Sequence, residues 1–193
     1  MRIYVSNGNS KLGTIPSISL PPVKSCGSVK CIDKCYALNI CKRFKHVRTQ
    51  WEENLKYYKY STKYPFPGTY FGDLLLWLVE YTPTHFRFHV GGDCPDEEYL
   101  TNVYKIAELA YDTKFMMFTK RYSWINPKRI PDNLNVLLSM WPYMENPPNE
   151  GLARTWVRGD LRAPTDIFKC KGQCQDCYQC WDKGTKDILL KGH

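Results

Sequence analysis

Apolar side chains recur with helical spacing in three parts of the chain. Between residues 36 and 60 they stand at every third or fourth position, which predicts an amphipathic helix with a basic opposite face. A second helix is predicted through residues 73–81, after a break containing proline and glycine at residues 64–68. A third opens at residue 95 with acidic side chains in its first turn and runs to about residue 111.

Short runs rich in β-branched, aliphatic and aromatic side chains predict strands between these helices. The predicted strands are residues 14–20, 85–90, 114–119, 135–141, 154–158 and a short last one at 187–190. Strands that alternate with helices or long connections indicate a mostly parallel sheet. Because a closed eight-stranded barrel takes roughly 250 residues, 193 residues favour an α/β fold of one domain, residues 1–193. We expect an incomplete TIM-type (β/α) barrel of five to six strands.

Polar and apolar side chains alternate along residues 85–90. The apolar set is Phe86, Phe88 and Val90, and the polar set is His85, Arg87 and His89. Because alternate residues of a strand point to opposite faces, Arg87 and His89 are expected to face the barrel interior, near the carboxyl end of the strand. A strand with one solvated face explains the alternation equally well.

Three loops carry the distinctive residues of this chain. In β/α barrels the chemistry lies at the carboxyl ends of the strands. Residues 26–35 follow the first predicted strand, residues 91–93 follow the second, and Lys120 and Arg121 follow the third. The sequence therefore predicts a functional site at one rim of the sheet, with positive charge from Lys120 and Arg121.

Nine cysteines give the chain its clearest chemical signal. Four of them have the spacing C-x3-C-x2-C-x2-C within a cysteine-rich C-terminal segment, residues 166–193. These four are Cys170, Cys174, Cys177 and Cys180, and a second group near the N-terminus contains Cys26, Cys31 and Cys35. Thiolates gathered so closely are typical ligands of an iron–sulfur cluster, with tetrahedral zinc as the competing occupant. Cys41 falls on an apolar helix stripe and is expected in the core.

Disulfides and membrane insertion are disfavoured. The cysteine count is odd, and the first residues lack the apolar core of a secretory signal peptide. The longest apolar run, residues 74–79, is too short to span a bilayer. We therefore expect a cytoplasmic protein without membrane association, in which thiols stay reduced. The net charge of +8 suits nucleic acid, a small anionic ligand or a thiolate-ligated cluster, and charge alone does not separate these.

The order of motifs resembles that of the radical S-adenosylmethionine (SAM) enzymes. A cysteine motif follows the first strand, Gly91, Gly92 and Asp93 form a Gly-Gly-acid turn after the second, and a partial barrel carries both. In that family three cysteines hold a [4Fe-4S] cluster whose open iron binds SAM, and the turn contacts the SAM amino group. The resemblance implies a radical-SAM-like barrel with these three residues at the cofactor. Arg87, His89 and Lys120 would supply further cofactor contacts.

A closer resemblance is to a phage- and plasmid-encoded family known only by a gene-product name. Its pattern is matched in order along nearly the whole chain by Asn9–Gly13, Cys35–Ala37, Gly92–Asp93, Thr119–Lys120 and Cys180–Trp181. The resemblance implies a phage protein that acts in the host cytoplasm. It implies little about activity, because that of the family is largely unassigned.

The cysteine spacing differs from the radical SAM pattern. That pattern, C-x3-C-x2-C, is expected near the N-terminus, where this chain has x4 and x3 between Cys26, Cys31 and Cys35. This spacing occurs instead at the C-terminus, where Cys180 would occupy the iron coordination site that SAM needs. A cluster closed by four cysteines suits electron transfer or structure, which argues against SAM as a cofactor.

Two functional hypotheses follow. The first is a [4Fe-4S] protein on a radical-SAM-like barrel, with a redox partner or a small anionic ligand, acting in electron transfer or as an unassigned enzyme. Its ligands are the four C-terminal cysteines, while the N-terminal three hold a second cluster or join a mixed set. The second is a zinc-stabilised nucleic-acid-binding module that uses the basic, aromatic stretch of residues 42–64. The contiguous spacing of the C-terminal cysteines favours the first hypothesis. The alternative interpretation of residues 42–64 is an amphipathic helix whose basic face is exposed to solvent.

Overall fold

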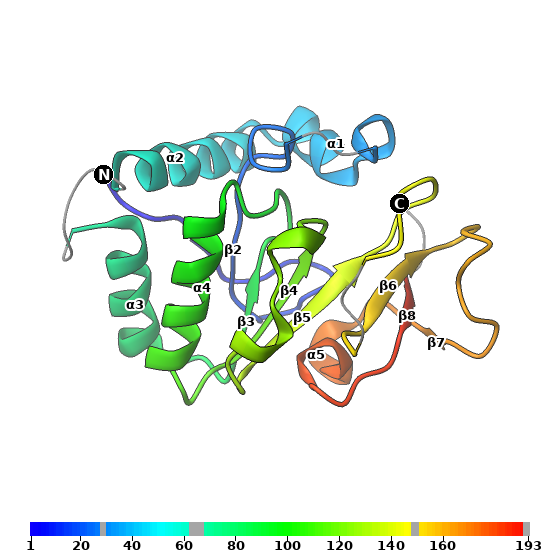
Figure 1. Cartoon of the computed structure of the whole chain (residues 1–193). Helices are drawn as coiled ribbons and strands as arrows, with labels where there is room; N and C mark the ends of the chain where they lie inside the picture. Colours follow the sequence, from blue (N-terminus) through cyan, green and yellow to red (C-terminus); the bar gives the residue numbers. More distant parts are fainter. Residues whose placement is uncertain (28–29, 62–67, 148–150, 191–193) are drawn as a thin grey trace.

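The structure is a computed structural model, described for residues 1–27, 30–61, 68–147 and 151–190 (Figure 1). An eight-stranded sheet with the order β1-β2-β3-β4-β5-β6-β8-β7 forms its centre. The strands are β1 (Val5–Ser6), β2 (Ser17–Ile18), β3 (His85–Phe88), β4 (Lys114–Thr119), β5 (Leu134–Ser139), β6 (Arg154–Val157), β7 (Phe168–Lys169) and β8 (Ile188–Leu190). Only the β1–β2 pair is antiparallel, and the sheet is open at β1 and β7. The mostly parallel α/β sheet is thus confirmed, whereas β1 and β7 were not predicted.

Five α-helices occur in the described part of the chain. They are α1 (Tyr36–Arg43), α2 (Lys45–Ser61), α3 (Tyr70–Tyr81), α4 (Glu97–Leu109) and the single turn α5 (Cys174–Cys177). Short 3-10 turns lie at η1 (Ile32–Lys34), η2 (Tyr122–Trp124), η3 (Pro127–Arg129) and η4 (Gln179–Trp181). None of the described helices is long and apolar enough to cross a membrane.

The long helix predicted for residues 36–60 is wrong in one respect, because it consists of two helices. Phe44 separates them with an extended backbone (φ −120°, ψ 93°) and leaves 41 % of its surface exposed. The bend lets Cys41 of α1 pack with Trp51 of α2 in one apolar cluster. Of the break predicted for residues 64–68, residues 64–67 lie outside the described part of the chain.

The largest core cluster lies between one face of the sheet and helices α2, α3 and α4 (Figure 1). Phe86 and Phe88 of β3 and Phe115 of β4 pack there with their rings 5.4–5.8 Å apart. Asp96 caps α4 by accepting a hydrogen bond from the Tyr99 amide, and it also accepts one from the Tyr58 hydroxyl of α2. This side chain therefore fixes α2 against α4.

The opposite face of the sheet is covered by the loop before β2 and by the C-terminal segment rather than by long helices. Leu12, from the loop before β2, packs there with Met116 of β4 and Trp181 of the C-terminal segment. The Trp181 indole donates a hydrogen bond to the Phe86 carbonyl oxygen at 2.9 Å. The Asn135 amide donates to the carbonyl oxygens of Cys180 and Asp182. The cysteine-rich segment is thus packed onto this face, opposite to α2, α3 and α4, which we call the inner face of the sheet.

Candidate metal centres

The three loops expected at one rim do meet there. Asp93 accepts hydrogen bonds from the Thr119 hydroxyl and the Lys120 amide, both at 2.8 Å, so the loop after β3 is joined to the end of β4. The Asp93 amide donates to the Ser25 hydroxyl at 3.2 Å, which joins the loop after β2 as well. Arg121 donates to the carbonyl oxygens of Ser25 and Cys94. The guanidinium predicted to face a ligand therefore anchors the first cysteine loop.

The two glycines of the rim are required by close packing. A Cβ on Gly91 would lie 2.3 Å from the Trp51 ring, and one on Gly92 would lie 2.5 Å from the Leu20 carbonyl oxygen. Gly92 also has a φ of +81°, a conformation that side chains rarely adopt. Burial raises the pKa of the Asp93 carboxyl, while the hydrogen bonds from the Lys120 amide and the Thr119 hydroxyl oppose that shift.

The N-terminal cysteine group lies at this rim, beside Asp93 and Lys120. Burial, with Asp93 nearby, raises the pKa of the Cys26 thiol to about 11. Burial also raises the pKa of the Cys31 thiol, and the Lys120 ammonium partly offsets that rise. A bound metal cation would have to displace these thiol protons. Cys35 occupies the N-cap of α1, so the third thiol of the group is fixed where that helix begins.

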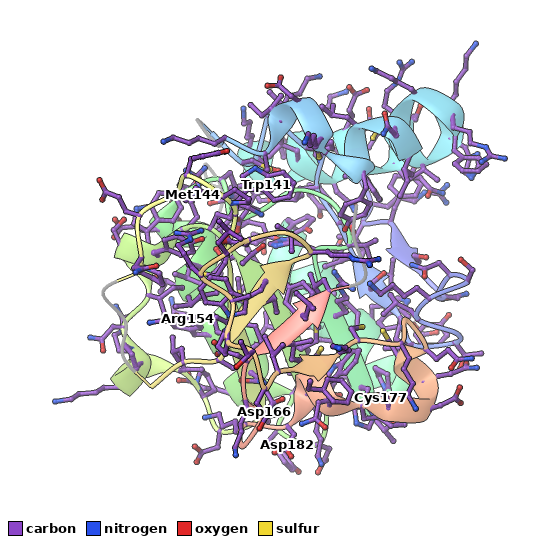
Figure 2. The ribbon with its side chains drawn as sticks, turned by 90° about the vertical axis from the view of Figure 1, so that its right-hand side faces the viewer. Trp141, Met144, Arg154, Asp166, Cys177 and Asp182 are labelled. Atoms are coloured by element: carbon purple, nitrogen blue, oxygen red, sulfur yellow. The ribbon has the colours of Figure 1, made fainter. Side chains whose placement is uncertain are left out.

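The C-terminal cysteine group surrounds one small pocket. Its four cysteines line that pocket together with Tyr178, Trp181 and Ile188. Cys174 and Cys177 are the ends of α5, and Tyr178 then adopts a left-handed conformation (φ 50°) that turns the chain toward Cys180. Burial raises the pKa of the Cys180 thiol to about 12, opposed mainly by the Arg87 guanidinium. Cys177 is exposed at the surface of the segment (Figure 2).

Residues of the loop before β2 also contribute to this site. The Lys11 carbonyl oxygen accepts a hydrogen bond from the Cys174 amide at 2.9 Å. The Lys11 ammonium and Arg87 both lower the pKa of the Cys174 thiol, against the larger opposite effect of burial. A Cβ on Gly13 would overlap the Gln175 side chain. Sequence reasoning missed this contact between the Asn9–Gly13 loop and the C-terminal cysteines, because no local pattern pairs segments so far apart.

Arg87 lies under the C-terminal cysteine group. It faces the inner side of the sheet, as predicted, and only 5 % of its surface is exposed. Its Nε donates to the His89 carbonyl oxygen at 3.3 Å, and its guanidinium stands 4.9 Å from the centre of the Phe118 ring. None of the described carboxylates lies within ion-pair distance of it. A buried charge without a counter-ion is costly. The adjacent groups able to become anionic include the thiols of Cys174 and Cys180 and the hydroxyl of Tyr36, which is hydrogen-bonded to Arg87.

The predicted inward orientation of His89 is wrong. Its Nε2 lies 3.0 Å from the hydroxyl of Tyr99, a residue of α4, so the ring is on the helical side of the sheet. The cause is that β3 ends at Phe88 and His89 adopts a positive φ of 59°, which breaks the alternation. Val90 accordingly packs on the inner side, with Leu12 and Trp181. Burial, reinforced by Arg87, lowers the His89 pKa to about 3, so the ring is neutral.

His89, Asp93 and Cys94 form a buried trio with potential ligand atoms within 4.8 Å of one another. Among the described residues, the His89 Nδ1 has no hydrogen-bond partner. The two Asp93 oxygens, however, accept three hydrogen bonds, from Thr119 and from the amides of Cys94 and Lys120. We therefore interpret these three residues as a buried structural support of the rim rather than as metal ligands. Cys41, expected in the core, is buried with 7 % of its surface exposed.

The two cysteine groups lie on different elements, and both alternatives for the N-terminal cysteines, a second cluster or a mixed ligand set, stay predictions. Figures 1 and 2 show α1, which follows the N-terminal group, at the opposite end of the molecule from α5. In the C-terminal group, Tyr178 lies by the amino end of β3, where its ring is 4.3 Å from that of His85. Cys170 instead follows the carboxyl end of β7, and its amide donates to the Leu189 carbonyl oxygen of β8. The N-terminal group lies at the carboxyl ends of β2, β3 and β4.

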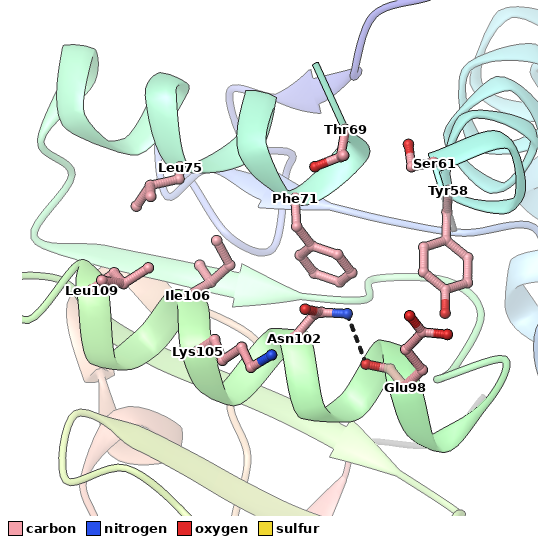
Figure 3. Close-up of a pocket in the computed structure, with 10 residues that line it drawn as sticks. All are labelled: Tyr58, Ser61, Thr69, Phe71, Leu75, Glu98, Asn102, Lys105, Ile106 and Leu109. Atoms are coloured by element: carbon pink, nitrogen blue, oxygen red, sulfur yellow. Dashed lines mark hydrogen bonds between the residues drawn. The ribbon is translucent and has the colours of Figure 1, made fainter. Parts of the chain in front are cut away.

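One hollow in the described part of the chain has no cysteine in its wall. It lies between helices α2, α3 and α4 (Figure 3) and has Tyr58, Phe71, Asn102 and Lys105 in its wall. The Asn102 amide in this wall donates to the Glu98 carbonyl oxygen at 3.0 Å.

The aromatic side chains of residues 42–64 are mostly unavailable for stacking on bases. Trp51, Tyr57 and Tyr58 are buried in the core. Phe44 and Tyr60 remain exposed, and Tyr64 lies outside the described residues. In the described part of this stretch, Phe44 and Tyr60 are therefore the large aromatic side chains exposed enough to stack on a base.

Comparison with known families now places the chain. The model of the family described as Gene product 88 matches residues 4–149. The chain belongs to this family. The matched part contains the N-terminal cysteines, the Gly-Gly-Asp turn and Lys120, and it ends before the four C-terminal cysteines. No curated protein and no solved structure matches the chain.

Proposed function

We propose that the protein binds a [4Fe-4S] cluster through Cys170, Cys174, Cys177 and Cys180 and acts in redox chemistry. The observation that carries this proposal is that all four thiols line one pocket above the buried, uncompensated charge of Arg87. An anionic cluster at that place would supply the missing counter-charge. With four cysteine ligands the irons have no open site, which suits electron transfer.

The composition of the ligand set and its spacing along the sequence support iron rather than zinc. The set is purely thiolate and contiguous, as is common for clusters and less so for zinc ribbons, which use two separated C-x2-C pairs.

The N-terminal cysteines are the candidates for a second cluster on a radical-SAM-like partial barrel. Three ligands would leave one iron open to a small anionic ligand beside Lys120. SAM is a weaker candidate there, because the Asp93 carboxylate that would meet its amino group accepts hydrogen bonds from Thr119, Cys94 and Lys120. We place this chemistry in the host cytoplasm, on the resemblance to phage-encoded proteins.

Anaerobic purification with iron, sulfide, zinc and absorption measurements tests the assignment. We expect a brown protein with iron matched by sulfide, at about four irons for one [4Fe-4S] cluster or about eight for two. Cys174→Ala and Cys177→Ala should abolish or convert the C-terminal cluster. Cys41→Ala is the matched control, because this cysteine is buried against Ala37 and Trp51 in α1 and should leave the iron content unchanged.

A colourless protein with stoichiometric zinc would overturn the iron assignment. Iron unaffected by both Cys174→Ala and Cys177→Ala, in variants that fold by circular dichroism, would remove the cluster from the C-terminal group. Neither result would depend on knowing the redox partner.

A further inference from the structure

The junction of α1 and α2 concentrates positive charge at the surface. Residues 34–51 contain five Lys or Arg side chains and no carboxylate. Four of these cations stand around the bend between the helices, and all four are exposed. We call this surface the α1–α2 corner; it consists of Lys42, Arg43, Phe44, Lys45 and Arg48.

None of the described carboxylates forms an ion pair with these four side chains, although Arg48 lies close enough to Glu52 to lower the pKa of that carboxyl. The ion pairs of this region use other residues, Lys24 with Glu52 and Lys56 with Glu53. Arg43 instead places its guanidinium 5.3 Å from the centre of the exposed Phe44 ring. Like charges held this close repel each other, so an anionic partner would be bound favourably here.

Helix polarity adds a second argument. Lys45 and Arg48 stand in the first turn of α2, which contains no acidic residue. Cations at that end oppose the helix dipole and so destabilise the helix slightly. The arrangement therefore does not serve the stability of α2, whereas it increases the positive potential that a polyanion would meet.

The chemistry of the corner favours a nucleic acid over a membrane surface. A membrane-binding helix needs a free apolar face, and Ala37, Cys41 and Trp51 of these helices are buried in the protein. An exposed ring among cations provides instead a place where an unpaired base can stack while phosphates contact the charges. Phe44 is that ring, with His46 edge-on at 6.0 Å.

We propose that the α1–α2 corner binds single-stranded nucleic acid. Lys42, Arg43, Lys45 and Arg48 contact phosphates, and Phe44 stacks on a base. This binding is independent of the metal, because none of the five residues belongs to either cysteine group.

Fluorescence anisotropy with a labelled single strand of about 20 nucleotides tests the proposal, using the full chain purified anaerobically. The corner variant carries Lys42→Glu, Arg43→Glu, Lys45→Glu and Arg48→Glu. The control variant makes the same change in net charge at four other exposed cations. These are Lys105 of α4, Lys114 of β4, and Lys128 and Arg129 of η3. Phe44→Ala and, as its control, Tyr111→Ala at another exposed ring complete the set.

We expect the corner variant to lose roughly tenfold or more in affinity, and its salt slope to fall by about 3 because four phosphate contacts are lost. The control variant should lose far less. Phe44→Ala should weaken binding by roughly fivefold, as loss of one stacked base requires, and Tyr111→Ala should not. Equal losses in the two charge variants, absence of binding by the unmodified chain, or an unchanged affinity of Phe44→Ala would each overturn the proposal.

Discussion

At the residue scale, Arg87 is the side chain whose environment is least consistent with a metal-free role. It is buried, its neighbours include the thiols of Cys174 and Cys180, and none of the described carboxylates pairs with it. A guanidinium in that position stabilises negative charge at the thiolates and at whatever they bind.

Replacing Arg87 should therefore alter the C-terminal site. Arg87→Met keeps the length of the side chain and removes the charge, so we expect a more negative reduction potential and lower iron retention. Arg87→Lys should recover part of both because it restores the charge. Redox titration and iron analysis measure the effect. Equal potentials in the two variants would show that the charge of Arg87 does not act on the site.

His89 gives the fold a dependence on pH. Its pKa is about 3 in the folded chain and about 6.5 when unfolded, so below pH 6.5 protons bind preferentially to the unfolded state. Its contribution to stability is complete above pH 6.5 and is lost as the pH falls toward 3, by about 2 kcal/mol at pH 5. Urea unfolding at pH 7.5 and 5 should show a smaller loss in His89→Gln. His46→Gln, at an exposed position, is the control and should lose as much stability as the unmodified chain.

At the element scale, the C-terminal segment serves as the inner layer of the fold. Trp181 of η4 is buried against Leu12 and Met116 and bonded to the backbone of β3. This contact places the turn between α5 and η4 and, with it, the Cys180 thiol. Stability of the sheet and assembly of the cysteine pocket are therefore coupled.

Trp181→Ala should destabilise the protein by about 3–5 kcal/mol, because it leaves a large cavity and removes a buried hydrogen bond. Iron bound at the C-terminal group should fall with it. Leu161→Ala is the control, since that side chain is fully exposed and should change neither quantity. Urea unfolding with iron analysis provides the measurement. A Trp181→Ala protein as stable as the control would show that the segment is not part of the core.

At the scale of the whole molecule, the two cysteine groups lie on different parts of the sheet. Figure 1 shows α1 beyond one end of the sheet and α5 near the other. Each group has its own cation, Lys120 at the rim and Arg87 at the inner face. If both groups hold clusters, they should load independently.

This independence can be measured with single substitutions. In a chain that binds about eight irons, Cys174→Ala should leave about four, and Cys31→Ala should also leave about four, each with the electron paramagnetic resonance signal of the remaining cluster. A mixed ligand set would instead lose all its iron in either variant. The double variant should be free of iron.

The sequence by itself determined the order of helices and strands, the parallel sheet and the rim. Helical spacing and β-rich runs are local properties, and the carboxyl ends of parallel strands always share an edge. Strand 114–119 was therefore predicted to the residue, and the meeting of Asp93 with Lys120 followed from topology. The prediction of a thiolate-ligated cluster likewise rests on the spacing of the cysteines along the chain.

The tertiary structure alone decided which side chains surround each site. A positive φ turned His89 to the helical face, and Arg121 was used as an anchor for the Ser25 loop. The exposed Phe44 divided the first long helix, and Trp181 placed the C-terminal cysteines on the inner face of the sheet, apart from the N-terminal group. Such outcomes depend on contacts between residues distant in the chain and on single backbone angles, which no periodic pattern of residue types records.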